Sequence, residues 1–254
     1  MTLYDYPQYF DLTFREETKL EADFIEAACQ KYGRWPAERL LEPGCGGGRL
    51  IVELARRDHE MVGLDTNLPA LAYLAGQLRR RKVDAEIFVA DMSQFRVPRQ
   101  VDAAFCTFNT FRHLATEQQA VQHLRCVARS LKRRGIYILG LHLLPLDVDE
   151  TCIERWTAQH GQVRVTVTLR VLSANRRLRS EEIRMSMLVR NGQREMRMRS
   201  EFSLRMYTPA QFRALLRKVP EFELCDVFDF WYEIEAPLRL NDEITDTVVV
   251  LRKR

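Results

Sequence analysis

The sequence predicts an α/β fold with a mostly parallel sheet, and three observations lead to that prediction. Apolar strand patterns alternate with amphipathic helix patterns through residues 36–144. A glycine-rich bend, EPGCGGG at 42–48, joins the first of these strands to the first helix. The period then changes to that of long antiparallel strands between residues 145 and 207. Alternating strands and helices favour a parallel sheet that is covered by helices on both faces.

The elements can be taken in order along the chain. Residues 1–35 are predicted to form an N-terminal cap or lid, because tyrosines at 4, 6 and 9 precede an amphipathic helix over roughly 15–32. The alternating core then comprises strand 38–43, helix 48–57, strand 60–65, helix 68–81, strands 85–90 and 101–108, helix 116–132 and strand 136–143. Right-handed crossovers place the carboxyl ends of these strands at one edge, where ligands bind.

Residues 145–207 are predicted to form an antiparallel β insertion that serves as a substrate lid or a dimer surface. Its strands are expected at 162–173, 178–190 and 194–206, with Asn191-Gly192 as a hairpin turn. A capping box with proline, Thr208-Pro209-x-Gln211, opens a helix that reaches about residue 218. Strands 222–232 and 246–252 follow as an antiparallel pair, so the core is predicted to comprise 36–144 and 208–254.

The glycine-rich bend is the most informative motif for function. Glu42, Gly44, Gly46 and Gly48 form the pattern acid-x-Gly-x-Gly-x-Gly. The dinucleotide fingerprint needs glycine where Arg49 stands, and the phosphate loop needs a Gly-Lys-Ser/Thr ending that is absent. A carboxylate beside the bend suits a positively charged ammonium group. The bend therefore points to S-adenosylmethionine rather than a pyrophosphate, and a ligand-free turn between strand and helix is the alternative.

Acids also end the second and third strands. Asp65 lies 19 residues after Gly46, where its carboxylate can accept both hydroxyls of a ribose, although it could instead cap the next helix. Asp91 can accept from an adenine amino group while the N–H of Met92 donates to the ring, although this dipeptide could simply form the turn that ends its strand.

Residues 108–114 follow the fourth strand and should face the reacting methyl group. They lack the acid/Asn-Pro-Pro-aromatic signature of enzymes that methylate base amines. His113 titrates near neutrality and can take a proton from an amine or hydroxyl acceptor. The alternative is a histidine that is bonded to backbone.

The net charge of +4 is unevenly distributed. Residues 151–207 hold 12 Arg and no Lys against five Asp and Glu, a net charge of +7. This excess suits an anionic substrate or nucleic acid, but we favour a solvated sheet face that resists edge pairing, because aromatic residues are sparse there. Six cysteines without a C-x-x-C pair suggest no metal site and reduced thiols in a cytoplasmic protein. We expect neither a membrane-spanning run nor a secretory leader.

Taken together, the motifs resemble those of class I S-adenosylmethionine-dependent methyltransferases. The resemblance rests on EPGCGGG at 42–48, LD at 64–65, AD at 90–91 and LKRRGIYIL at 131–139, which is similar to the family's L-K-P-G-G lead into the fifth strand. It implies a Rossmann-like, seven-stranded, mostly parallel sheet with its last strand antiparallel. The chain also resembles small-molecule N-methyltransferases acting on amino sugars or glycine-like amines, through its β insertion, YTPAQF and His113-Leu114, which matches a proposed base. Its Arg-rich insertion departs from that group.

The predicted function is methyl transfer from S-adenosyl-L-methionine to a small-molecule acceptor, with nitrogen preferred to oxygen. The predicted donor-binding residues are Glu42, Gly44, Cys45, Gly46, Asp65, Thr66, Asp91, Met92, Phe108 and Asn109. The predicted catalytic residues are His113, Tyr4 and Tyr6, without a metal. The alternatives are an RNA methyltransferase that uses the Arg-rich insertion and a non-catalytic cofactor-binding protein. A monomer and a homodimer are both compatible with the sequence.

Overall fold

A computed structural model of the chain describes residues 3–33, 35–144 and 152–254. The main sheet contains β1 (Arg39–Pro43), β2 (Glu60–Asp65), β3 (Ala85–Val89), β4 (Val101–Cys106), β5 (Leu131–His142), β10 (Phe222–Phe228) and β11 (Asp246–Lys253). Their order is β10-β11-β5-β4-β1-β2-β3, and β11 alone runs antiparallel to its neighbours in this described sheet. The predicted seven-stranded, mostly parallel sheet with an antiparallel last strand is confirmed.

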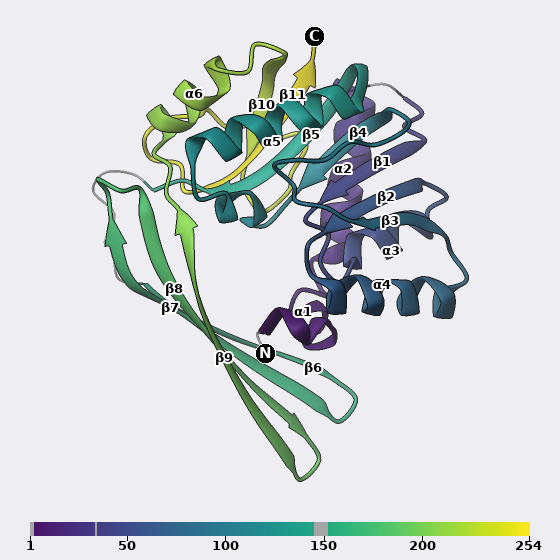
Figure 1. Cartoon of the computed structure of the whole chain (residues 1–254), viewed down its shortest axis with the longest axis vertical. Coiled ribbons are helices and arrows are strands. Elements are labelled where there is room, and N and C mark those ends of the chain that lie inside the picture. The colour runs from purple at the N-terminus through teal and green to yellow at the C-terminus, as the bar shows by residue number, and fades with distance from the viewer. Residues whose placement is uncertain (1–2, 34, 145–151) are drawn as a thin grey trace.

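Helices cover both faces of this sheet (Figure 1). They are α2 (Thr18–Tyr32), α3 (Arg49–Ala55) and α4 (Leu68–Arg81) on one face, and α5 (Glu117–Ser130) and α6 (Pro209–Arg217) on the other. Successive strand residues point to opposite faces, so Leu40 of β1 packs with the first group of helices while Leu41 packs with the second. Strands β1, β2, β4 and β5 are therefore mostly buried, whereas β3 at the edge of the sheet is more exposed. The carboxyl ends of these five parallel strands meet at one edge.

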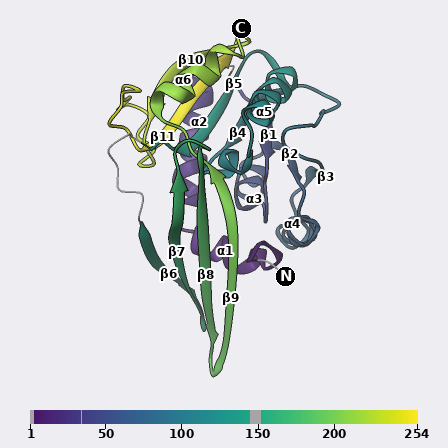
Figure 2. The same cartoon turned by 60° about the vertical axis from the view of Figure 1, so that its left-hand side comes forward.

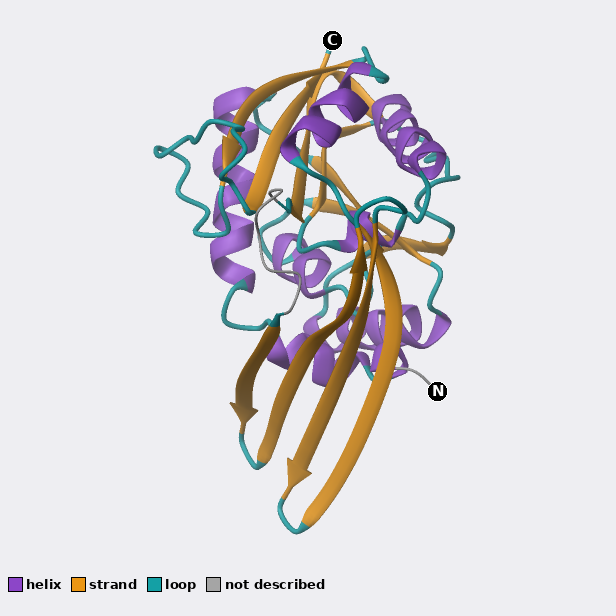
Figure 3. Cartoon of the chain, turned by 90° about the vertical axis from the view of Figure 1, so that its left-hand side faces the viewer, coloured by secondary structure: helices purple, strands orange, loops and turns teal. Residues whose placement is uncertain are grey.

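The insertion forms a second, four-stranded antiparallel sheet that extends away from the core (Figures 2 and 3). Its strands are β6 (Ile153–His160), β7 (Val163–Asn175), β8 (Ser180–Asn191) and β9 (Arg194–Arg205). The three predicted strands are present, and β6 is an addition. Most β6 residues are exposed at the edge of the sheet, so its sequence lacks the regular alternation that identifies a strand. The predicted start of the insertion, residues 145–151, lies outside the described residues.

The N-terminal segment, defined here as residues 3–14, lies between the core and the insertion (Figure 1). It contains the short 3-10 helix η1 (Leu3–Asp5) and α1 (Pro7–Thr13), which the sequence analysis did not predict. Leu3 and Leu12 pack with Val165, Val167 and Met187 on the inner face of the insertion. The same segment contacts α4 of the core. The N-terminal segment therefore contacts both the insertion and the core.

Several element ends differ from the prediction. Helix α5 stops at Ser130 and β5 starts at once at Leu131, five residues before the predicted strand. A register shift against β4 lets the polar LKRRG stretch join the strand, and polar residues hide such a start from an apolar pattern. Strand β10 ends at Phe228 rather than at 232. Among the described residues, no helix has both the length and the apolar character needed to cross a membrane.

Candidate functional site

The glycine bend connects β1 to α3 at the carboxyl edge of the sheet. Gly44, Gly46 and Gly48 have φ values of 74°, 52° and 74°, in the left-handed region that glycine adopts without strain. A Cβ atom at Gly44 would lie 2.5 Å from the Thr110 methyl carbon, so this position is closely packed. A Cβ atom at Gly46 would meet no atom within 4 Å. The bend is thus open at its centre and is not filled by its own side chains.

Asp65, at the end of β2, is bonded directly to this bend. Its Oδ2 accepts a hydrogen bond from the Gly46 N–H at 2.7 Å, and its Oδ1 accepts from the Asn67 N–H at 2.8 Å. Helix α4 is capped by Asn67, whose Oδ1 accepts from the Ala70 N–H at 2.8 Å. Asp65 is therefore not the cap itself. Each carboxylate oxygen can accept a second bond, and so Asp65 keeps capacity for a ligand beside Gly46.

Glu42 is buried at the end of β1, and its Oε2 has no hydrogen-bond partner among the described residues. Burial raises the pKa of this carboxyl group well above its usual range, and the positive charge of Arg49 opposes the shift. The nearby carboxyl groups of Glu21, Asp11 and Asp65 raise the pKa further. A buried acid with an unpartnered oxygen is costly, and a bound cation with hydrogen-bond donors would satisfy it.

Arg49 and Asp11 complete the charges around the bend. Arg49 Nη2 lies 2.5 Å from Oε1 of the fully buried Glu21, so this guanidinium is already engaged in an ion pair. Burial raises the pKa of Asp11 to about 7, against the opposing charges of Arg49 and Arg15. Asp11 was not among the predicted residues, because nothing in its local pattern indicates that α1 brings it to the bend.

The third strand tip lies next to Asp65. The Ala90 N–H donates to the Asp65 carbonyl at 3.2 Å, and the exposed Asp91 follows, with Oδ1 accepting from the N–H and the hydroxyl of Ser93, each at 2.7 Å. The sulfur of Met92 lies 3.8 Å from the position that a Cβ atom would take on Gly44. The side chain of Met92 therefore reaches the bend.

A histidine that the sequence analysis missed holds this third tip in place. His123 of α5 is fully buried, and its Nδ1 lies 2.8 Å from the Met92 carbonyl. Its Nε2 lies 2.6 Å from the Tyr137 hydroxyl. Burial lowers the pKa of His123 to about 4. A neutral ring can donate from Nδ1 to the carbonyl and accept from the tyrosine, which fixes the position of Met92.

The fourth strand tip begins with two residues in the left-handed region, Phe108 (φ 61°) and Asn109 (φ 68°). Asn109 Oδ1 accepts from the His142 N–H of β5 at 2.8 Å. The Phe108 ring meets Phe14 of the N-terminal segment at 4.6 Å between centroids and stacks on Phe230 at 5.7 Å. Residues with strained backbone dihedrals cluster at functional sites. Here the left-handed conformation of Phe108 accompanies its contacts with the rings of Phe14 and Phe230.

His113 ends the 3-10 helix η2 (Thr110–His113) and meets the N-terminal segment. The Tyr4 hydroxyl lies 3.4 Å from His113 Nε2, and Phe202 of β9 lies 5.4 Å from the His113 ring, centroid to centroid. Burial and then the charge of Arg112 lower the pKa of His113, and the residue keeps some exposure to solvent. Burial, and then the charge of Asp65, raise the pKa of Tyr4. The histidine is therefore neutral at pH 7 and can accept a proton.

The remaining predicted residues occupy different surroundings. Cys45 is buried, and its sulfur lies 3.0 Å from the Cβ position of Gly63 in β2, so the side chain points into the sheet. Thr66 is exposed between β2 and α4. The recorded ring contact of Tyr6 is with Tyr9, at 6.3 Å, rather than with His113. A ligand at the bend could therefore contact the main chain of Cys45 rather than its side chain. The contact with His113 is made by Tyr4, and Tyr6 stacks on Tyr9.

Six arginines of the insertion lie on the face opposite Phe202, whereas Arg179 and Arg205 contact the core. In the register, Phe202 pairs with Ile183 on the inner face, and alternation places the next residues on the outer face. The outer-face arginines of β7 to β9 are Arg164, Arg170, Arg184, Arg190, Arg197 and Arg199. Glu195 and Glu201 form ion pairs with four of them. The predicted basic face exists, but it points away from His113.

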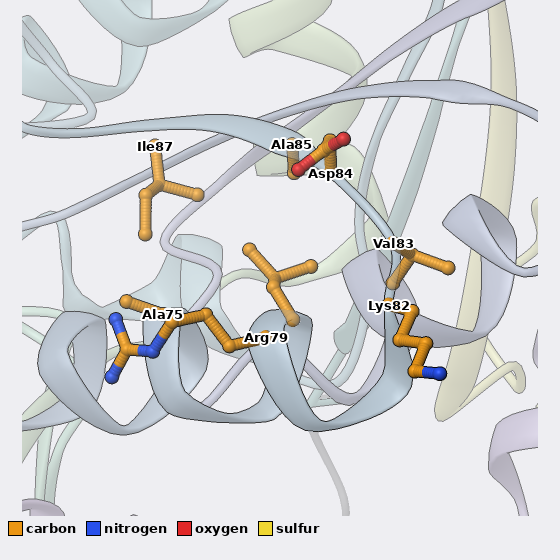
Figure 4. Close-up of a pocket in the computed structure, with 8 residues that line it drawn as sticks. Ala75, Arg79, Lys82, Val83, Asp84, Ala85 and Ile87 are labelled. Atoms are coloured by element: carbon orange, nitrogen blue, oxygen red, sulfur yellow. The ribbon is translucent and has the colours of Figure 1, made fainter.

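A surface depression elsewhere does not involve this edge of the sheet. It lies where α4 ends and β3 begins, and Figure 4 shows Arg79, Lys82 and Asp84 among its lining residues. This is the edge opposite the carboxyl ends of the strands, and none of the predicted site residues line it. Within the described ranges, no group of three or more His, Cys, Asp or Glu residues is arranged to hold a metal ion.

Sequence comparisons agree with this geometry. Residues 40–135 match the family model described as "Methyltransferase domain". The chain is 27% identical over 130 residues to dTDP-3-amino-3,6-dideoxy-α-D-glucopyranose N,N-dimethyltransferase of Streptomyces fradiae, a match covering 51% of this chain and 49% of that protein. The chain spans about half the length of the curated relatives that it matches, 48% and 49%.

Solved structures show the same fold over nearly the whole chain. An S-adenosylmethionine-dependent methyltransferase from Clostridium acetobutylicum superposes with a TM-score of 0.79 at 15% identity, covering 98% of this chain and 97% of that one. An amino pentose methyltransferase from Micromonospora echinaspora, solved with S-adenosylmethionine bound, has a TM-score of 0.72 at 19% identity, covering 97% and 94%. The predicted methyltransferase resemblance and fold are confirmed, and the cofactor of these proteins is the one that the sequence predicted.

Proposed function

We propose that the chain, whose residues 40–135 match the methyltransferase domain model, transfers a methyl group from S-adenosyl-L-methionine to a small-molecule acceptor. The acceptor atom is nitrogen rather than oxygen. The N-terminal cap and the insertion enclose the acceptor, while the core of residues 36–144 and 208–254 holds the donor.

The excess of carboxyl groups at the glycine bend is the observation that carries this proposal. The charges of Glu21, Asp11 and Asp65 all raise the pKa of Glu42 there, and the charge of Arg49 opposes them. One Glu42 oxygen is buried without a partner. The donor brings an ammonium and a sulfonium group, whose positive charges match this deficit. A dinucleotide would instead bring a pyrophosphate, which these acids would repel.

The donor-binding residues follow from the strand tips. Glu42 and the main chain of Gly44, Cys45 and Gly46 take the methionine part. Asp65 accepts the ribose hydroxyls, because both of its oxygens keep acceptor capacity beside the open Gly46. Asp91 and Met92 bind the adenine, and Thr66 lies exposed next to the ribose. Phe108 and Asn109 face the methyl end of the donor.

The acceptor is positioned by the group of Tyr4, His113 and Phe202. When bound, the donor supplies an electrophilic methyl carbon, whose bond to sulfur breaks with the electron pair going to sulfur. Orienting the acceptor nitrogen in line with that bond can contribute about 7–11 kcal/mol. His113, which is neutral because its pKa is lowered, takes the proton that the nitrogen loses. An alkyl hydroxyl would need a stronger base than imidazole, and aromatic rings stabilise a methylated ammonium product.

An RNA acceptor is less compatible with the described residues. The arginines that could contact phosphates lie on the outer face of the insertion, whereas Phe202 lies on the inner face. RNA bound to that outer face would not present a base to His113 through the same sheet. Binding to RNA that weakens steeply with salt would support the RNA alternative, and no binding at low salt would remove it.

Calorimetric titration with S-adenosylmethionine tests the donor site. Asp65→Asn removes a charged acceptor of two ribose hydroxyls, so we expect affinity to fall at least tenfold, since a charge-assisted hydrogen bond contributes about 1.5–3 kcal/mol. Asp58→Asn, at an exposed position beyond the other end of α3, is the matched control and should bind normally. Unchanged affinity in Asp65→Asn would refute the assignment. Turnover on amines with their hydroxyl counterparts as controls tests the acceptor, and binding without turnover would favour a non-catalytic cofactor-binding protein.

A further inference from the structure

The position of Asp11 extends the donor site into the N-terminal segment. A Cβ atom built on Gly47 would lie 2.6 Å from Asp11 Oδ1 and 3.0 Å from its Cγ. The carboxyl group of α1 therefore lies directly against the main chain of the bend. Its charge acts on both Glu42 and Cys45 of that bend. Only glycine at 47 leaves room for this approach.

The carboxyl group of Asp11 has unused hydrogen-bond acceptor capacity in its described surroundings. The structure shows no hydrogen-bond donor to its carboxyl group among the described residues. Two cations, Arg49 and Arg15, act on it, and Arg49 is paired with Glu21. The unpartnered, buried Oε2 of Glu42 belongs to the same group of charges. Next to Gly47, the open position at Gly46 leaves space beside these two acids. Two carboxyl groups with spare acceptor positions suit a primary ammonium, which has three N–H donors.

We propose that Asp11 binds the ammonium group of the methyl donor together with Glu42, so that the donor itself fastens the N-terminal segment onto the core. This inference rests on the proposed function. The same segment carries Tyr4, whose hydroxyl lies 3.4 Å from His113 Nε2, and Asp5, which accepts from the Asn67 side chain at 3.4 Å. Fastening Asp11 therefore also fixes one wall of the acceptor site. The donor's amino acid part thereby acts on the acceptor site.

Two neutral-sulfur ligands isolate this contact. S-adenosylhomocysteine keeps the ammonium group, whereas 5′-methylthioadenosine has the same nucleoside and thioether without the amino acid part. In Asp11→Asn we expect the affinity for S-adenosylhomocysteine to fall about tenfold or more, which is the range of a lost charged hydrogen bond. The affinity for methylthioadenosine should stay within about twofold. Glu16→Gln, an exposed acid just after the segment, controls for long-range charge and should change neither.

The ratio of the two affinities is the deciding quantity, because a partly misfolded sample loses both ligands alike and leaves the ratio unchanged. A ratio equal to that of the unsubstituted chain would overturn the role of Asp11. Failure of the proposed function is distinguishable, since neither ligand would then bind the unsubstituted chain. A second readout is amide hydrogen exchange: S-adenosylhomocysteine should slow exchange in residues 3–14 more than methylthioadenosine does. Equal protection by both ligands would contradict the fastening of the segment.

Discussion

The buried ion pair between Arg112 and Glu181 joins the proposed acceptor site to the insertion and can be tested by Glu181→Gln. The two residues are 3% and 6% exposed and form a direct ion pair, while Arg112 Nε also donates to the Arg205 carbonyl at 2.9 Å. Neutralising Glu181 leaves a buried guanidinium without its counter-charge. Removing one partner of such a pair costs about 3–5 kcal/mol. At roughly 2–4 °C per kcal/mol for a chain of this size, the melting temperature should fall by about 6–20 °C.

Scanning calorimetry, together with urea unfolding followed by tryptophan fluorescence, measures this loss. Arg190→Gln is the control, because its pair with Glu195 is exposed and such pairs contribute about 1 kcal/mol or less. The double variant Arg112→Met with Glu181→Leu removes both charges and should recover most of the stability. A Glu181→Gln variant that is no less stable than the Arg190→Gln control would refute the reasoning, since the pair would then not be buried in solution.

Three further predictions concern the site. In the unliganded chain, the pKa of Asp11 is raised to about 7 from about 4 in the unfolded chain. Burying this group therefore lowers the free energy of unfolding, by an amount that increases from pH 4 to pH 7 and is constant above pH 7. Asp11→Asn should thus raise the melting temperature increasingly from pH 4 to 7, and a pH-independent difference would contradict this. Because the pKa of His113 is lowered, turnover should fall only below about pH 6.5. His113→Gln should abolish this fall at acid pH and slow turnover by about 10²-fold or more. An unchanged pH profile in the variant would exclude His113 as the base. Gly44 has φ at 74°, and a Cβ atom there would lie 2.5 Å from Thr110, so Gly44→Ala should lower donor affinity. A Cβ atom on Gly76 in α4 would meet no atom closer than 3.6 Å. The control Gly76→Ala should therefore raise the free energy of unfolding in urea by about 0.5–1 kcal/mol.

The sheet could be predicted from sequence because its signals are local. Strand β2 and helix α4 begin and end at the predicted residues, 60–65 and 68–81, since apolar periodicity and the proline at Pro69 mark them directly. The glycine bend and the acid at Asp65 were found for the same reason. Strand β6 and helix α1 were missed, because an exposed edge strand and a seven-residue helix are stabilised by tertiary contacts rather than by their own pattern.

The candidate site was predictable only on its core side. Residues at strand tips converge because parallel strands share an edge, so Glu42, Asp65 and Asp91 could be placed from order alone. Asp11 lies 36 residues before Gly47 in the chain, and Phe202 lies 89 residues after His113. The contact between Tyr4 and His113 joins residues that are 109 positions apart. No local pattern encodes such an approach. It depends on how the N-terminal segment packs on the insertion.

The antiparallel direction of β11 has a practical consequence for fusion proteins. Its final residues pair with the beginning of β5, with Arg252 opposite Ile136, so the chain leaves the sheet on the side opposite the strand tips, as Figure 1 shows for the C-terminus. Leu3, in contrast, starts a helix whose next residue touches His113. An affinity tag or reporter joined after Arg254 therefore leaves the edge of the candidate site unobstructed, whereas a group attached near Tyr4 would lie beside His113 and compete with ligands for the same space.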